Sequence, residues 1–80
     1  MVEVFKTNVR EAHYATLLIQ QIHNTFTNYT ANFDLEDCDN ILRVECKEGP
    51  IKPSAIIDFL QSFGYIANVL PDEINLQYRY

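Results

Sequence analysis

The chain has few of the residues on which the most recognisable protein functions depend. It contains no Trp, two Gly, two Cys and only six Lys plus Arg, against 11 Asp plus Glu. The net charge is −5 and the basic residues form no cluster, so we expect no nucleic acid and no anionic membrane surface among its partners. Two cysteines do not make a disulfide framework, which favours a reducing, cytoplasmic location.

Long apolar runs are also missing. No run approaches the ~18 apolar residues that a membrane helix needs, and residues 1–20 lack the basic and apolar regions of a signal peptide. Hydrophobic residues nevertheless make up 48% of the chain, with five Phe and five Tyr, which argues against disorder. We therefore expect one small domain with a thin core, because a chain this short buries only roughly 60–65% of its unfolded surface.

Hydrophobic periodicity predicts six elements. Residues 2–5 alternate as a strand, and residues 9–26 carry one helical stripe, with Asn8 and Glu11 as a capping box. Two alternating runs around a polar turn at residues 37–40 predict a β-hairpin. A second helix begins at Pro53 and has Gly64 as its expected C-cap, and a last strand follows over residues 65–70.

The predicted order is β-α-β-β-α-β. Right-handed crossovers put both helices on the same side of the sheet. The expected fold is therefore α+β, a ferredoxin-like two-layer sandwich with a four-stranded antiparallel sheet and two helices on one face. We assign residues 1–72 to this domain and residues 73–80 to a C-terminal tail that could form an extra strand.

The predicted interaction surface lies on the open face of the sheet and in the tail. Phe5, Ile66 and Leu70 are expected to form a small apolar patch there. The tail alternates too, with apolar side chains at Ile74, Leu76, Tyr78 and Tyr80. Four placements of the tail are open: it folds over the patch, extends the sheet, pairs with another molecule, or frays.

The chain resembles a heavy-metal-associated domain, the fold of copper chaperones, over about residues 2–70. The likeness rests on the element order, on Phe33-Asp34-Leu35 entering the hairpin, and on Pro53-Ser54-Ala55-Ile56-Ile57 leading to Phe63-Gly64-Tyr65. Members of that family bind metal through a Met-x-Cys-x-x-Cys loop, whose positions are held here by Lys6, Asn8 and Glu11. An amide and one carboxylate do not grip a soft ion such as Cu(I), so the resemblance implies a docking module without metal or cofactor.

The sequence gives less support to the other candidate ligand sites. Asn8, Glu11 and His13 form the alternative, an atypical metal or small-ligand carrier, although capping explains the first two residues. His13 and His23 lie ten residues apart on one helix, about 15 Å along its axis, and cannot share an ion. Cys46 is expected in the core, while Cys38 lies in the hairpin turn, too far away for a disulfide within one chain.

No catalytic constellation is visible in the sequence. An acylphosphatase-type hydrolase, which shares this topology, would need Arg10 with Asn32 or Asn68, but the Gly-rich phosphate cradle is missing. The acidic turn around residues 34–39 lacks the Gly of a calcium loop. We therefore predict a non-enzymatic interaction or regulatory module, whose partner is a second copy or another protein.

Overall fold

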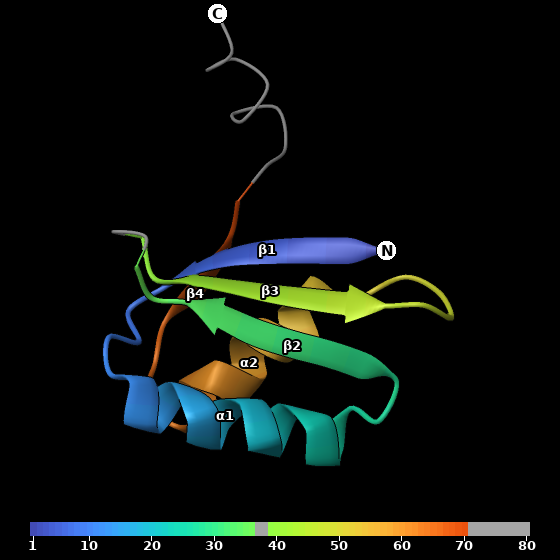
Figure 1. The fold of residues 1–80 in the computed structure, drawn as a ribbon. Coiled ribbons are helices and arrows are strands. Elements are labelled where there is room, and N and C mark those ends of the chain that lie inside the picture. Colours follow the sequence, from blue (N-terminus) through green and yellow to red (C-terminus); the bar gives the residue numbers. More distant parts are fainter. Residues whose placement is uncertain (37–38, 71–80) are drawn as a thin grey trace, which may run out of the picture.

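The computed structural model of the chain describes residues 1–36 and 39–70. Its elements are β1 (Val2–Thr7), α1 (Ala12–Thr25), β2 (Tyr29–Asp34), β3 (Ile41–Cys46), α2 (Pro53–Ser62) and β4 (Ala67–Val69). The strands pair in the order β2-β3-β1-β4, and every pairing is antiparallel. The predicted β-α-β-β-α-β order and the ferredoxin-like topology are confirmed (Figure 1).

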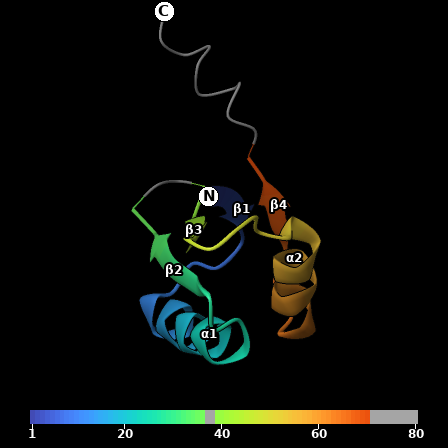
Figure 2. The same cartoon turned by 90° about the vertical axis from the view of Figure 1, so that its right-hand side faces the viewer.

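Both helices lie on the same side of the sheet, and no helix of the described residues covers the other side (Figure 1). Seen along the strands, α1 lies beneath β2 and α2 lies beneath β4, so each helix covers one edge half of the sheet (Figure 2). Neither helix in the described part of the chain is long and apolar enough to cross a membrane.

The core is built from the side chains that the two helices and the sheet turn toward each other. On α1 the buried residues Ala15, Leu18 and Ile22 follow the predicted stripe. On α2 they are Ile56 and Leu60. The strands and loops add the remaining buried apolar residues of this cluster: Phe5, Val9, Ala31, Leu42, Val44, Cys46, Ile51 and Ala67. The predicted core position of Cys46 is thus confirmed, whereas the predictions for Cys38 concern a position outside the described residues.

The first strand is shifted in phase relative to the prediction. Phe5 is fully buried and pairs with Leu42, so its placement on the open face of the sheet was wrong. The strand continues through Thr7, which is buried, and its hydroxyl is satisfied there because it donates to the carbonyl of Asn40 (2.7 Å) and accepts the N–H of Val9 (3.2 Å). A strand that ends in the core at Thr7 turns Phe5 inward and Val4 outward.

The first helix begins later than predicted, at Ala12 rather than residue 9. Its N-cap residue is Glu11, without a side-chain capping bond, so the predicted capping box was wrong. The Asn8 amide oxygen instead accepts the N–H of Ile66 (2.9 Å), and the Asn8 N–H donates to the carbonyl of Ile66 (3.2 Å). These bonds and the complete burial of Val9 keep residues 8–11 outside the helix.

The second helix ends at Ser62 and Phe63 is its C-cap, so Gly64, the predicted cap, is the next residue, one position after the observed cap. The N–H of Gly64 donates to the carbonyl of Gln61 (2.9 Å), and the N–H of Tyr65 donates to the carbonyl of Leu60 (3.0 Å). This pair of bonds is the Schellman motif, which needs a left-handed residue just past the helix. Gly64 supplies it with φ 90° and turns the chain toward β4.

Candidate functional site

The first loop, which the carrier hypothesis uses, is tied into the fold. Because the amide oxygen of Asn8 accepts the N–H of Ile66, a cation there would have to share or displace this hydrogen bond. Glu11 and His13 are exposed, and the ring of His13 lies edge-on to Tyr14. Within residues 1–36 and 39–70, no group of three or more His, Cys, Asp or Glu is arranged to hold a metal ion.

The two histidines of α1 have different surroundings. His23 accepts the backbone N–H of Ala31 through Nε2, at 3.0 Å, and so links the last turn of the helix to β2. His13 lies in the first turn, where its ring contacts Tyr14. His23 is therefore a structural contact of the edge strand, which periodicity alone did not reveal.

The two asparagines offered for the acylphosphatase alternative lie on different strands. Arg10 is exposed in the loop before α1. Asn32 and Asn68 are exposed on β2 and β4, the two opposite edges of the sheet. At most one of the two amides could therefore take part in a site with Arg10.

The predicted interaction surface is only partly where it was expected. Phe5 belongs to the core and is therefore not part of the interaction surface. Ile66 is 61% exposed just before β4, and Leu70 is half-buried, with its N–H donating to the carbonyl of Val4 (2.8 Å). The tail residues of this prediction lie outside the described residues: Ile74, Leu76, Tyr78 and Tyr80.

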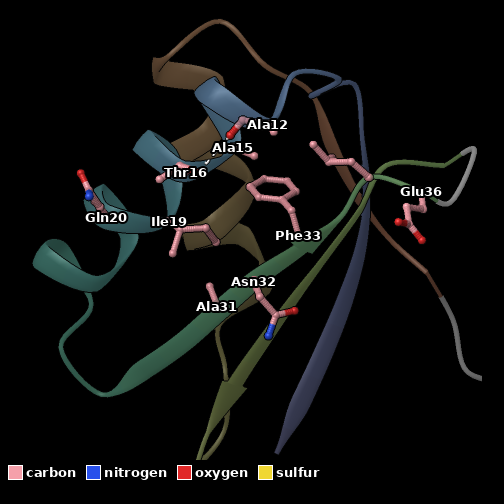
Figure 3. Close-up of a pocket in the computed structure, with 10 residues that line it drawn as sticks. Ala12, Ala15, Thr16, Ile19, Gln20, Ala31, Asn32, Phe33 and Glu36 are labelled. Atoms are coloured by element: carbon pink, nitrogen blue, oxygen red, sulfur yellow. Dashed lines mark hydrogen bonds between the residues drawn. The ribbon is translucent and has the colours of Figure 1, made fainter.

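A groove lies between α1 and the edge strand β2. Its volume is about 400 Å³. Ten residues line it: Ala12, Ala15, Thr16, Ile19 and Gln20 from α1, and Ala31, Asn32, Phe33, Leu35 and Glu36 from β2 and the turn after it. Figure 3 shows the ring of Phe33 between the strand and the helix, facing Ala15 and Ile19.

The groove has an apolar floor and a polar rim. Phe33, Ile19 and Leu35 are partly buried and pack against the core, so their remaining surface faces the groove. The exposed side chains of Thr16, Gln20 and Glu36 lie around it. Such a surface suits a segment that carries apolar side chains on one side and polar ones on the other.

The groove runs beside backbone groups at the edge of the sheet. The N–H of Tyr29 donates to the carbonyl of Phe26 (3.0 Å) and that of Ala31 donates to His23, so the backbone of these residues points away from β3. Backbone direction alternates along a strand that pairs on one side. The N–H and C=O of Phe33 therefore point outward as well, beside the groove, where an added strand could bond to them.

A second apolar hollow lies on the helical side of the molecule. Its volume is about 360 Å³, and it is lined by Tyr14, Leu17, Leu18, Gln21, Phe63 and Tyr65. Tyr14, Leu17 and Phe63 are each almost half exposed. None of these lining residues belongs to a strand, so the hollow offers apolar contact rather than a strand to pair with.

Sequence reasoning missed the groove because it results from the packing of a helix against an edge strand. The one available signal is the run of short side chains Ala12, Ala15 and Thr16, at positions i, i+3 and i+4 of α1. On the side of a helix that faces a strand, short side chains leave space. The same run is also an ordinary feature of helices, so by itself it does not point to a site.

Comparison with protein-family models, with curated proteins and with solved structures found no match. The resemblance to heavy-metal-associated domains therefore stays a prediction from the sequence.

Proposed function

We propose that this protein is a non-enzymatic interaction module that binds an extended peptide segment in the groove between α1 and β2. The observation that carries the proposal is the apolar groove of about 400 Å³ alongside an edge strand. Proteins commonly recognise peptides in this way, by adding a strand to an exposed sheet edge. The resemblance to a family of docking modules is in keeping with such a role.

In the proposed complex, backbone and side chains of the peptide have separate tasks. The outward N–H and C=O of Phe33 bond to the peptide backbone, which gives affinity without regard to sequence. Alternate side chains then point into the groove, because successive residues of a strand face opposite sides. Phe33, Ile19 and Leu35 provide the apolar contact surface for them.

The charge of the groove supports binding rather than chemistry. Glu36 is the one ionisable side chain among the described residues that line it. The lining hydroxyl belongs to Thr16, which donates to the carbonyl of Ala12 at 3.0 Å. A nucleophile needs an adjacent base to become reactive, and Figure 3 shows Glu36 at the far end of the groove from Thr16.

The proposal is tested by titrating the protein with the heptapeptide Thr-Val-Thr-Val-Thr-Val-Lys, acetylated and amidated, and following backbone amide signals by NMR. We expect the signals of Thr16, Ile19 and Phe33 to shift most, because these residues line the groove. The variant Thr16→Arg should weaken peptide binding by about tenfold or more, because an arginine side chain would fill the groove. This corresponds to a loss of about 1.4 kcal/mol or more in the free energy of binding. Asn24→Arg, an exposed position of α1 that is not among the lining residues, is the matched control.

Two further results complete the test. Peptides N-methylated at alternate residues should separate into binders and non-binders, because only every second backbone group faces the added strand. If no groove signal shifts at millimolar peptide, or if the shifts centre on Leu17 and Phe63 instead, the groove is not the binding site.

A further inference from the structure

The sequence of the chain itself contains a segment that matches β2. Residues 74–79 alternate between apolar and polar side chains, as residues 29–34 do. Ile74, Leu76 and Tyr78 would fall beside the helix-side residues of β2. Asn75, Gln77 and Arg79 would then fall beside Thr30, Asn32 and Asp34, on the open face. In this alignment apolar pairs meet on the groove side and polar pairs meet on the solvent side.

Charge decides the direction of the added strand. In a parallel alignment Arg79 lies beside Asp34, near Glu36, and opposite charges attract. In an antiparallel alignment of the same faces, Glu73 would lie beside Asp34, and like charges opposite each other are destabilising. The Oδ1 atom of Asp34 accepts the N–H of Glu36 (3.3 Å), so a guanidinium would pair with the other carboxylate oxygen. The parallel alignment is therefore favoured.

The same molecule cannot supply this strand in the aligned register. The described chain ends at Leu70 beside β4, on the edge of the sheet opposite β2. A strand added outside β2 lies four strand spacings from β4, or about 19 Å. The four residues from Leu70 to Ile74 span at most about 14 Å. A tail that reached the groove of its own molecule would have to slip along β2, which would separate Arg79 from Asp34.

We propose that the groove binds the C-terminal tail of a second copy of this chain, with residues 74–79 adding in parallel to β2, so that two copies exchange tails. This inference rests on the interaction module proposed above and names its partner. Reciprocal exchange uses the same two surfaces twice, which closes the assembly as a dimer. Each groove is then filled, and the outward backbone groups of Phe33 gain partners.

The test is a charge exchange between two variants of the full chain. Asp34→Lys and Arg79→Glu each place like charges together, so each variant alone should dimerise at least about tenfold more weakly than the wild type. In an equal mixture, the lysine introduced at position 34 of one copy meets the glutamate introduced at position 79 of the other, and the second pair is the unchanged Asp34 with Arg79. We therefore expect the mixture to restore the dimer, as measured by native mass spectrometry and sedimentation.

Controls separate this effect from loss of folding or of net charge. Asp58→Lys on α2 and Lys47→Glu after β3 change the charge equally at exposed positions away from the groove, and should leave the dimer intact. Circular dichroism should show each variant folded. Leu76→Asp should also prevent dimerisation, whereas Gln77→Asp, on the other face of the added strand, should weaken it less.

The outcomes distinguish the two proposals. A wild-type monomer, or a mixture that fails to restore the dimer, would overturn the exchange of tails. The interaction module would still stand if the Thr-Val heptapeptide bound the groove of that monomer. If the heptapeptide fails to bind even the monomeric Leu76→Asp variant, the proposed function falls as well.

Discussion

Three single side chains satisfy backbone groups of distant segments. Thr7 donates its hydroxyl to the carbonyl of Asn40, Asn8 accepts the N–H of Ile66, and His23 accepts the N–H of Ala31. Each bond fixes a loop or a strand edge that the sheet ladder does not reach. Such bonds are worth about 1 kcal/mol each when formed, and a buried backbone group left without a partner costs more.

At the same scale, the phase of β1 can be tested by truncating its side chains. Phe5→Ala should lower the free energy of unfolding by roughly 3–5 kcal/mol, because the ring is fully buried and its loss leaves a cavity. Val2→Ala should cost about 0.5 kcal/mol or less, because Val2 is 50% exposed. Urea unfolding followed by circular dichroism measures both. Equal losses at the two positions would contradict the inward placement of Phe5.

At the scale of the elements, Gly64 determines how α2 joins β4. Its φ of 90° is one that L side chains rarely adopt, while a Cβ added there would meet no atom within 4 Å. Gly64→Ala should therefore destabilise the fold by roughly 1–2 kcal/mol through backbone strain alone. Gly64→Asn should cost less, because Asn tolerates the left-handed region better. Thermal unfolding of the two variants checks this order, and a reversed order would show that packing rather than φ matters at this position.

The elements that could be predicted are those whose own residues show a clear hydrophobic periodicity. The stripes of α1 and α2 and the two alternating runs of the hairpin gave the order and the layers, because each pattern is local. The phase of β1 could not be predicted locally, since Val2 and Val4 are as apolar as Phe5 and the alternation fits either face. The role of Asn8 depends on Ile66, 58 residues away, and the groove depends on the packing of α1 against β2.

At the scale of the whole molecule, the proposed association at the sheet edge would add stability to a domain with a thin core. A small domain has only a modest net free energy of unfolding. Strand addition at β2 would cover the groove and also pair the outward backbone groups of this edge strand. Because folding would then be coupled to dimerisation, the apparent stability would depend on protein concentration.

The coupling predicts how the midpoint of thermal unfolding varies with concentration. A tenfold increase favours a folded dimer by about 1.4 kcal/mol, or about 0.7 kcal/mol per chain. For a domain of this size that corresponds to a rise of roughly 3–5 °C in the midpoint. Arg79→Glu alone should show a smaller change of midpoint over the same concentration range, and an equal mixture with Asp34→Lys should recover the wild-type dependence. A wild-type midpoint that is constant from micromolar to millimolar protein would mean that the chain folds as a monomer, with its groove open to another partner.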